Sequence, residues 1–363
     1  MGFDSFLGNP QAVAAVREML AGGRVQGALL FTGPEGVGKK TLATMLAKAL
    51  VCEKGPGDFC GICAMCRKAE DRFNAAREDL ARRREMKDSA RRVEGLVYFD
   101  LQIIEPITRF ILTEQIRQMR NVAYTRPFEF RRRVFILDDA QTIHWQAVDL
   151  VLKVLEEPPD TSAFILVCPN PYELRPTIRS RCVRVPFQPV EESLILQILA
   201  KEKRLTKPQQ ALAVRVAAGS VAKAKAFDPV TYEKQRQPWL GYLEALAGES
   251  PSSTTELDWP RLFDSTRALS ESRDDFEGSL AIGYSLLRDL LHCLLEGSPK
   301  EVVNVDLLPR LKAWAHKLGL RGIDTLKAGL DEAYRLQIRN VNQQVGLEAL
   351  AIDVLRGSVT GVP

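Results

Sequence analysis

The chain has 363 residues, of which 45% are hydrophobic and 26% charged, and its formal net charge is +4. This length is expected to form two or three domains, and the composition is that of a globular protein rather than a disordered or fibrous one. So small a positive charge permits a nucleic-acid partner but argues against a protein that coats nucleic acid. Residues 1–10 lack a signal-peptide pattern and no apolar run reaches about 18 residues, so we expect a cytosolic protein with no membrane partner.

The first 187 residues alternate between helical and strand patterns. Asn9-Pro10 is a typical helix start, with a capping side chain before a proline at the first helical position, and Gly22-Gly23 ends that helix. Largely apolar runs recur at residues 28–31, 97–104, 134–137 and 164–167. Continuous apolar strands separated by helices predict a parallel sheet covered by helices on both faces, an α/β fold.

A glycine-rich segment, GPEGVGKKT, follows the first apolar run and precedes a helical pattern. Its candidate nucleotide-binding residues are Gly33, Gly36, Gly38, Lys39, Lys40 and Thr41. Such glycines let backbone N–H groups surround phosphates at a helix N-terminus. In the pattern G-x4-G-K-[ST], Lys40 takes the position of the hydroxyl that binds Mg²⁺, and shifting the register to Lys40-Thr41 replaces both glycines. The segment therefore predicts a phosphate-binding loop, or a plain glycine-rich turn as the alternative, but not a competent Mg²⁺–ATP site.

The apolar run at residues 134–137 ends in two acids, Asp138 and Asp139. In P-loop proteins, a strand that ends in an acid places a carboxylate beside the metal ion. We therefore take Asp138 and Asp139 as candidate residues of the same nucleotide site. The alternative is that both acids only cap the element that follows.

Four of the seven cysteines lie within residues 52–66, at Cys52, Cys60, Cys63 and Cys66. A disulfide framework is typical of short secreted chains, which this is not. Four thiolates, the last three at two-residue gaps, can converge tetrahedrally on Zn²⁺ and leave no open position for catalysis. The spacing predicts a structural zinc module, with free buried cysteines or a redox pair as the alternatives.

Residues 67–95 are a dense mixture of basic and acidic side chains. Opposite charges stand four residues apart in the favourable order at Glu78/Arg82, Asp79/Arg83 and Asp88/Arg92. This indicates a solvated surface helix. A helix that contacts DNA is the alternative, although its acids offset most of its basic residues.

The rest of the chain has a helical pattern. We expect a small helical lid at residues 188–245 and an α-helical domain at 246–363, whose pattern is entirely helical beyond a Pro/Ser-rich stretch at 251–255. Residues 176–182, PTIRSRC, considered alone, predict only a helix end with two arginines.

Taken together, these motifs resemble the clamp-loader branch of the AAA+ proteins. The resemblance rests on the four-cysteine insert and on three further segments: LVLKVLEEPPDTSAFILV at 150–167, IRSRC at 178–182, and RNVNQQVGLEALAIDVL at 339–355. It covers most of the chain. It implies an AAA+ P-loop domain at 1–187, with its zinc module at 52–66 and the charged insert at 67–95, a lid at 188–245, and an oligomerisation (collar) domain at 246–363.

Departures from the hydrolysing members favour the delta-prime class of this family over the gamma/tau class. Lys40 has no hydroxyl, and Asp139 stands where hydrolysing members carry the glutamate that positions water. Residues 168–171 replace the sensor threonines, and Lys223 takes the place of the sensor arginine in the lid. By contrast, the Ser-Arg-Cys motif around Arg181 is intact.

The resemblance implies a mechanism that works between subunits. Clamp loaders are pentameric rings of gamma/tau, delta and delta-prime subunits within the DNA polymerase III holoenzyme, and they load the sliding clamp on primed DNA. ATP bound by one subunit is completed by the Ser-Arg-Cys arginine of the next, so Arg181 is expected to act in trans as an arginine finger. The implied cofactor is structural Zn²⁺, with negligible ATPase activity of the chain itself. A catalytically active gamma/tau-like ATPase and a purely structural ring subunit remain the alternatives.

Overall fold

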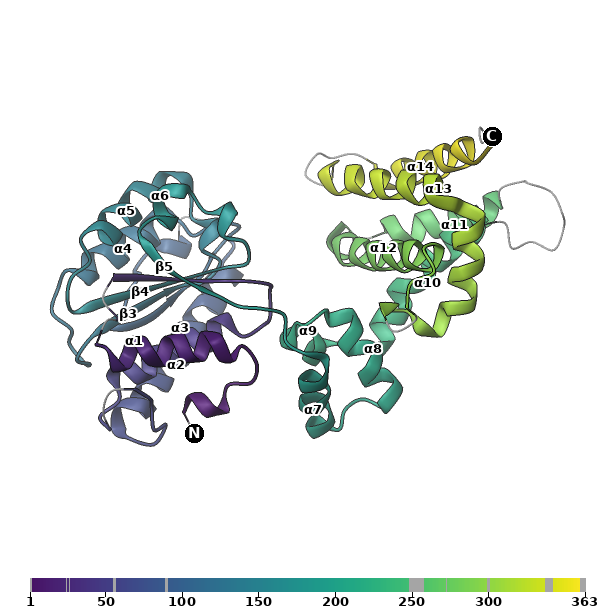
Figure 1. The fold of residues 1–363 in the computed structure, drawn as a ribbon. Helices are drawn as coiled ribbons and strands as arrows, with labels where there is room; N and C mark the ends of the chain where they lie inside the picture. Colours follow the sequence, from purple (N-terminus) through teal and green to yellow (C-terminus); the bar gives the residue numbers. More distant parts are fainter. Residues whose placement is uncertain are drawn as a thin grey trace. The chain divides into compact units, whose positions relative to one another are not determined.

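The computed structural model describes residues 2–23, 25, 27–54, 57–88, 91–247, 258–271, 273–298, 301–336 and 342–359. They form two compact units (Figure 1). Unit 1 comprises Met1–Glu202 and Ala217–Lys225, and unit 2 comprises Lys203–Val216 and Ala226–Pro363. Residues of the predicted lid, 188–245, are divided between the two units. The three-part division with boundaries at 187 and 245 therefore stays a prediction. The stretch 251–255 and the start of the 339–355 motif lie outside the described residues.

Unit 1 is built on a five-stranded parallel sheet with the strand order β2-β3-β4-β1-β5. The strands are β1 (Gly27–Thr32), β2 (Leu101–Ile104), β3 (Arg133–Leu137), β4 (Ser162–Cys168) and β5 (Cys182–Pro186). Every residue of β2, β3 and β4 is buried, as the largely apolar runs predicted. Strand β2 covers only the second half of the predicted run at 97–104. The edge strand β5 was not predicted, because only one of its five residues is fully buried and its sequence has no apolar run.

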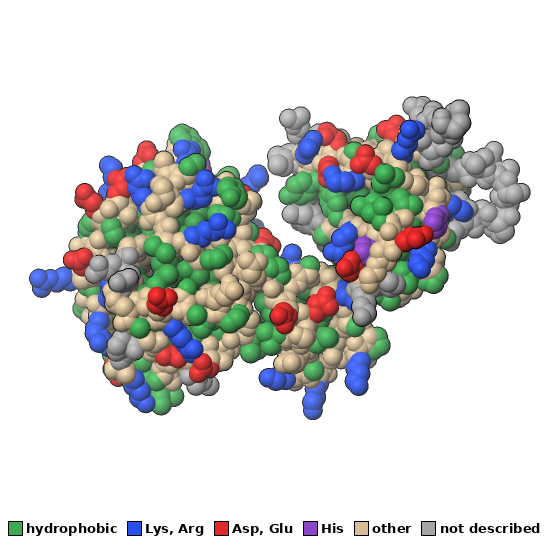
Figure 2. Space-filling model, viewed as in Figure 1, with side chains coloured by type: hydrophobic (Ala, Val, Ile, Leu, Met, Phe, Trp, Pro, Cys, Tyr) green, Lys and Arg blue, Asp and Glu red, His purple; other side chains and the backbone are tan. Residues whose placement is uncertain are grey.

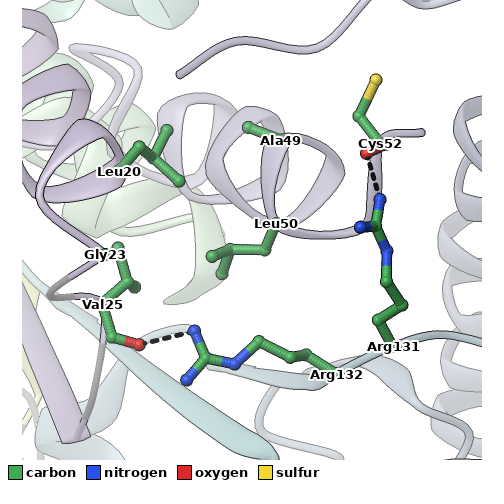
Figure 3. Close-up of a pocket in the computed structure, with 8 residues that line it drawn as sticks. All are labelled: Leu20, Gly23, Val25, Ala49, Leu50, Cys52, Arg131 and Arg132. Carbon is green, nitrogen blue, oxygen red and sulfur yellow. Dashed lines mark hydrogen bonds between the residues drawn. The ribbon is translucent and has the colours of Figure 1, made fainter. Parts of the chain in front are cut away.

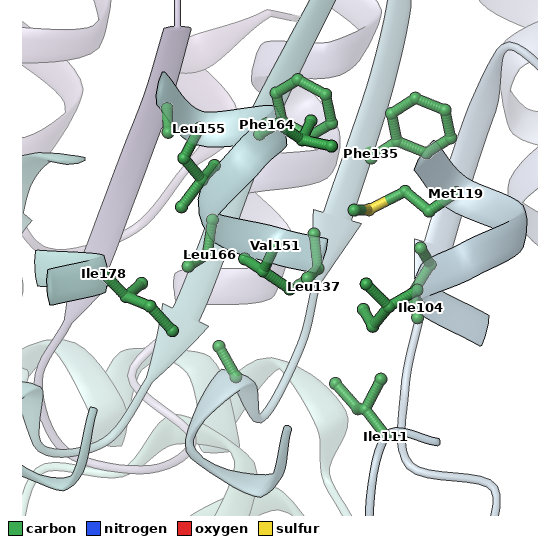
Figure 4. Close-up of a cluster of buried hydrophobic side chains, with 14 of the residues drawn as sticks. Ile104, Ile111, Met119, Phe135, Leu137, Val151, Leu155, Phe164, Leu166 and Ile178 are labelled. Carbon is green, nitrogen blue, oxygen red and sulfur yellow. The ribbon is translucent and has the colours of Figure 1, made fainter. Parts of the chain in front are cut away.

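Helices cover both faces of this sheet, which confirms the predicted α/β class (Figure 1). They are α1 (Pro10–Ala21), α2 (Lys39–Val51), α3 (Ala64–Glu85), α4 (Thr113–Ala123), α5 (Val148–Glu156) and α6 (Pro176–Arg179). Unit 1 also contains α7 (Glu192–Glu202) and α9 (Val221–Ala226), which follow the last strand in the chain. Figure 4 shows the core between the sheet and helices α4 and α5, where the rings of Phe135 and Phe164 stack at 5.6 Å. Met119 of α4 and Val151 of α5 complete this layer and are fully buried. Packing of this kind fixes the carboxyl ends of the strands, from which the site is built.

Helix α1 begins at Pro10, as predicted, but Asn9 does not cap it. The backbone of Asn9 is left-handed, with φ 49°, and its side chain bonds no helical N–H group. Its amide group instead exchanges two hydrogen bonds with the backbone of Gln188, at 3.1 and 2.6 Å. Asn9 thus ties the start of the chain to the segment after β5.

The charged segment 67–95 is α-helical only as far as Glu85, and a short 3-10 helix follows at Arg91–Val93. Of the three predicted pairs, Asp79–Arg83 forms, whereas Arg82 also pairs with Asp79 rather than with Glu78. Asp88–Arg92 does not form as a helical pair, because the chain has left the helix by Asp88, and Asp88 pairs with Arg91. Arg83 is only 6% exposed, so this helix is not simply a solvated face.

Unit 2 is helical in its described residues. Its helices are α8 (Lys207–Ala217), α10 (Pro229–Ala247), α11 (Trp259–Ser270), α12 (Arg273–Leu294), α13 (Leu308–Leu336) and α14 (Gln343–Val359). Trp314 and Tyr242 are fully buried at its centre. The buried carboxylate of Asp289 accepts hydrogen bonds from the N–H groups of Val303 and Asn304 and so fixes the connection between α12 and α13. None of the helices in the described part of the chain has the length and apolar character needed to cross a bilayer.

Candidate nucleotide pocket and four-cysteine cluster

The predicted phosphate-binding loop connects β1 to α2, and it contacts α9. Gly36 has φ +72°, and a Cβ atom there would lie 2.1 Å from the hydroxyl oxygen of Ser220. The N–H group of Ala222 donates to the carbonyl oxygen of Gly36 at 3.1 Å. The loop can approach α9 this closely only because residue 36 has no side chain.

This loop borders a cavity of about 560 Å³. The lining includes Gly38, Lys39, Lys40, Thr41, Asp138 and Asp139, so the structure brings the predicted loop and the predicted acids together. Gly33 and Lys223 do not line the cavity. Lys225, two residues after Lys223, does line it, and α9 thus presents a different lysine from the one the sequence predicted.

Both lysines of the loop are engaged with the protein itself. Lys39 is 7% exposed and donates to the carbonyl oxygens of Gly33 and Pro34, each at 2.6 Å. Burial lowers the pKa of Lys39, and the nearby carboxylate of Asp138 offsets part of that effect. The loop lysine is therefore held against its own loop by charge-assisted hydrogen bonds.

Lys40 is held by two carboxylates. Its ammonium group pairs with Glu105 and lies 3.2 Å from Asp138 Oδ2. Burial raises the pKa of Asp138, and the charge of Lys40 opposes that rise. Sequence reasoning missed Glu105, although the signal was available, since it is the first acid after the apolar run at 97–104.

Two further positions matter for hydrolysis in the family: Asp139 and the segment 168–171 that replaces the sensor threonines. Asp139 begins a 3-10 turn but does not cap it with its side chain, so the simple capping alternative is not observed. Asn170, in the segment that replaces the sensor threonines, accepts a hydrogen bond from the N–H group of Tyr172 at 3.0 Å. Only its neighbour Pro169 lines the cavity.

Arg181 lies outside this cavity, between α6 and β5. Its guanidinium group donates to the carbonyl oxygen of Thr177 at 2.9 Å and forms an ion pair with Glu156, the last residue of α5, at 2.5 Å. The side chains of Arg181 and Glu156 are 34% and 47% exposed. The arginine is therefore accessible from outside the chain.

The four predicted cysteines form one cluster. The sulfur atoms of Cys52, Cys60, Cys63 and Cys66 all lie within 4.8 Å of one another, and those of Cys52 and Cys60 are 3.8 Å apart. A tetrahedral Zn²⁺ site with Zn–S bonds of about 2.3 Å needs S–S separations of about 3.8 Å, so this donor set fits Zn²⁺.

Backbone N–H groups support the sulfur atoms as thiolates. The N–H groups of Cys60, Cys63 and Cys66 donate to the sulfurs of Cys52, Cys60 and Cys63, at 3.3 to 3.5 Å. Hydrogen bonds from the backbone of Ile62 and Cys63 lower the pKa of the Cys60 thiol to about 6. Burial has the opposite effect on Cys66 and raises the pKa of its thiol to about 12. A structural metal ion requires its cysteine ligands as thiolates, so its binding would displace the remaining protons.

Two anchors attach this cluster to the rest of unit 1. Arg131, just before β3, donates to the carbonyl oxygen of Cys52 at 2.7 Å (Figure 3). On the other side, Asp58 accepts a hydrogen bond from the N–H group of Phe3 at 2.9 Å, and the ring of Phe3 packs edge-on against Phe59. The cluster thus holds the N-terminal turn of the chain in place.

Helix α3 begins at the cluster, directly after Cys63, and several of its basic side chains form contacts within the protein. Arg72 forms a two-point ion pair with Glu129. Arg84 donates to the carbonyl oxygen of Pro106 at 2.8 Å and lies 3.2 Å from Glu105. On the face of unit 1 drawn in Figure 2, basic and acidic side chains are interspersed. The DNA-contacting alternative for residues 67–95 gains no support from these contacts.

Comparison with known proteins identifies the family. A family model described as "DNA polymerase III, delta subunit" matches residues 8–191, half of the chain. The DNA polymerase III subunit gamma/tau of Mycobacterium tuberculosis is 29% identical over 204 residues, 55% of this chain and 31% of the relative. The subunit tau of Escherichia coli K12 is 31% identical over 228 residues, 61% of this chain and 32% of the relative. The chain thus spans about a third of the length of these curated relatives.

Among solved structures, a DNA polymerase III gamma subunit-related protein of Thermotoga maritima aligns with 96% of this chain and 99% of its own, at 15% identity and a TM-score of 0.46. The family assignment does not depend on that weak likeness. It follows from the matched half of the chain, which contains the predicted phosphate-binding loop, the four cysteines and the Ser-Arg-Cys motif. The chain belongs to the DNA polymerase III delta-subunit family, within the clamp-loader AAA+ proteins.

Proposed function

We propose that this chain is the delta-prime-type subunit of a bacterial clamp loader, which assists ATP hydrolysis in a neighbouring subunit and does not perform it. In this proposal, the chain takes one place in a pentameric ring with gamma/tau and delta subunits. The ring loads the sliding clamp on primed DNA. Arg181 supplies the positive charge that completes the neighbour's ATP site.

The observation that carries this proposal is that Arg181 is accessible and does not line the cavity of its own chain. An arginine finger must reach the phosphates of another subunit. To do so, Arg181 exchanges Glu156 for phosphate. An ion pair this exposed contributes only about 0–1 kcal/mol, so the exchange costs little free energy.

The chain's own cavity supports the second half of the proposal. Lys40 brings an ammonium group where Mg²⁺ needs an oxygen ligand, and Asp139 is one methylene shorter than the glutamate that orients water. The segment that replaces the sensor threonines presents only Pro169 to the cavity. These changes fall on separate elements of one site, and each weakens hydrolysis.

The four-cysteine cluster has a structural role in this proposal. A closed shell of four thiolates leaves Zn²⁺ no position for substrate. The metal would hold residues 52–66 together and, through Asp58, the N-terminal turn. Zn²⁺ is thus a cofactor of folding here.

A gamma/tau-like ATPase is the second candidate. The curated relatives described above are gamma/tau and tau subunits, and their identity of 29% to 31% favours it. Activity of the isolated chain separates the two candidates, because a gamma/tau-like chain would hydrolyse ATP with its own loop. The third candidate is a purely structural ring subunit in which Arg181 has no role in hydrolysis.

Reconstitution of the complex with subunits of the same organism tests the role of Arg181. Arg181→Ala should leave the protein folded and able to join its partners, yet slow hydrolysis at the adjoining site by roughly 10³-fold, the usual effect of removing an arginine finger. Bulk ATPase activity should fall less, because the other sites keep their own arginines. Arg181→Lys should rescue poorly, since a point charge does not reproduce the planar guanidinium.

The matched control is Arg179→Ala, two residues away. Arg179 stacks over Tyr172 and donates to the carbonyl oxygen of Pro171, so its loss should affect local packing alone. DNA-stimulated ATPase activity and clamp loading are measured for each variant. If Arg181→Ala matches wild type in both assays, the role in trans is wrong and the structural candidate replaces it.

A further inference from the structure

Four side chains of alternating charge run from helix α3 to the end of β3: Arg84, Glu105, Lys40 and Asp138. Glu105 is shared, because one carboxylate oxygen pairs with Lys40 and the other lies 3.2 Å from Arg84 Nη2. Lys40 in turn lies 3.2 Å from Asp138. The carboxylates are the less exposed members, with side chains of Glu105 and Asp138 only 12% and 17% exposed.

The centre of this row is the position at which a P-loop site holds its metal ion. In such sites, Mg²⁺ lies between the residue that follows the loop lysine and an acid at the carboxyl end of another strand of the sheet. Here those two residues are Lys40 and Asp138, and both line the cavity. The two carboxylates around the Lys40 ammonium group are the hard oxygen ligands that Mg²⁺ prefers.

We infer that Lys40 is a tethered replacement for the divalent cation: its ammonium group fills the metal position between Asp138 and Glu105, and Arg84 of the charged insert shares Glu105 and offsets part of its negative charge. The inference rests on the proposed function only in taking this cavity to be non-hydrolytic. It also gives the insert a role, since Arg84 reaches Glu105 from helix α3.

The replacement changes the charge that the cavity offers to a ligand. Arg84 and Lys40 together balance the two carboxylates, so the row carries no net charge. A divalent ion in place of Lys40 would add one positive charge beside the loop. Since Coulomb attraction between a fixed charge and a phosphate scales with that charge, the cavity attracts polyphosphates less than a metal-loaded site does.

Manganese binding by the full, zinc-loaded chain tests the inference. Mn²⁺ is titrated in the presence of ADP, and free Mn²⁺ is measured by electron paramagnetic resonance. Wild type and Lys40→Arg, which keeps a cation, should bind no Mn²⁺ at this position. Lys40→Ser should gain one site that Mg²⁺ displaces. In the Lys40→Ser chain, Asp138→Asn should weaken that site by about tenfold or more, because one charged ligand is lost.

The matched control is Lys48→Ser. Lys48 lies on the same helix, α2, and pairs with Glu70 instead of a cavity residue. Its removal should create no Mn²⁺ site. If Lys40→Ser folds, as judged by circular dichroism, and binds no more Mn²⁺ than Lys48→Ser, the inference is wrong. Wild type that binds Mn²⁺ as tightly as Lys40→Ser overturns it equally.

A second substitution tests the part assigned to Arg84. In the Lys40→Ser chain, Arg84→Ser removes a positive charge beside Glu105 and should tighten Mn²⁺ binding by about fivefold. An unchanged Mn²⁺ affinity would show that Arg84 has no influence on the charge of Glu105 at this site. These titrations use the isolated chain, whereas the role of Arg181 is measured in the complex, so failure of one leaves the other standing.

Discussion

Arg83, Arg133 and Arg236 are buried in this protein, with 6%, 4% and 5% of their surface exposed. Arg83 donates to the carbonyl oxygens of Arg92, Glu94 and Gly95 and thereby fixes the end of the charged insert. Arg133 and Arg236 pair with Asp100 and Asp306. A guanidinium group with five donors suits such positions because it can satisfy several acceptors at once.

Replacing Arg133 with Met should destabilise unit 1 strongly. The Arg133–Asp100 pair is almost fully buried, and breaking such a pair by removing one partner costs about 3–5 kcal/mol. Urea unfolding at pH 7 measures the change. The control is Arg82→Met, on an exposed pair with Asp79, which should cost less than about 0.5 kcal/mol. Equal losses of unfolding free energy in the two variants would contradict the strong stabilisation expected from the buried Arg133–Asp100 pair.

The Arg133→Met effect should also depend on pH. Burial opposes ionisation of Asp100, but the Arg133 guanidinium and the N–H groups of Glu129 and Phe130 outweigh it and hold its pKa below the ordinary value. A carboxylate with a depressed pKa in the folded state adds stability above its unfolded pKa, about 3.9, and loses that stability as pH falls through the folded value. The stability gap between wild type and Arg133→Met should therefore be full at pH 7 and narrow below about pH 4.

Distance along the chain decides which site residues the sequence could predict. Cys60, Cys63 and Cys66 are close neighbours, so their spacing alone indicated one metal site. Glu105 lies 65 residues after Lys40, and only the fold brings the two together. A pattern of neighbouring residues cannot contain such a pair. The apolar run at 97–104 could mark Glu105 as a candidate acid, but only the fold shows that it pairs with Lys40.

At the scale of elements, the four-cysteine module should behave as one folding unit with its metal. The purified protein should contain about one zinc per chain, and Cys63→Ser should release it, because closed four-cysteine sites contribute folding energy. Serine keeps the helix cap, since the residue 63 side chain accepts the Cys66 N–H group that starts α3. Hydrogen exchange should quicken in the described residues of 50–66 and in the N-terminal turn that Asp58 holds. The sheet should keep its protection.

Cys293→Ser is the control for this variant. Cys293 is buried in unit 2, whereas the four cysteines belong to unit 1, so its replacement should leave the zinc content unchanged. Protein purified without chelator that contains no zinc would exclude the metal site.

Strands with a largely apolar sequence were predicted, whereas the strand with a more polar, exposed sequence was not. Strands β3 and β4 are apolar after their first residues, Arg133 and Ser162, and both were predicted. In β5, Val183 is 54% exposed and Pro186 ends the strand, so the sequence has the pattern of a loop. Its place in the sheet comes from pairing with β1, a contact between distant residues that periodicity cannot show.

For the whole molecule, we expect negligible Mg²⁺-dependent ATPase activity of the isolated chain. Metal stabilisation of phosphoryl transfer is worth several kcal/mol, on the order of 10³-fold or more in rate, and Lys40 stands in the way of the metal. Lys40→Thr should not restore turnover, because Asp139 and the missing sensors remain. Phosphate release from the full chain is the measurement, with Lys48→Thr as the matched variant. Robust hydrolysis by wild type would favour the gamma/tau-like candidate.

The position of β1 between β4 and β5 has a consequence for how the chain reaches its fold during synthesis. The first strand of the sheet finds both of its partners late, since Gly27 pairs with Ala163 and Ala28 with Cys182. At a synthesis rate of about 5–20 residues per second, this apolar strand waits on the order of ten seconds with both edges unpaired. An unpaired apolar strand is a template for aggregation. Nascent unit 1 is therefore most exposed to aggregation in the interval before β4 and β5 have left the ribosome.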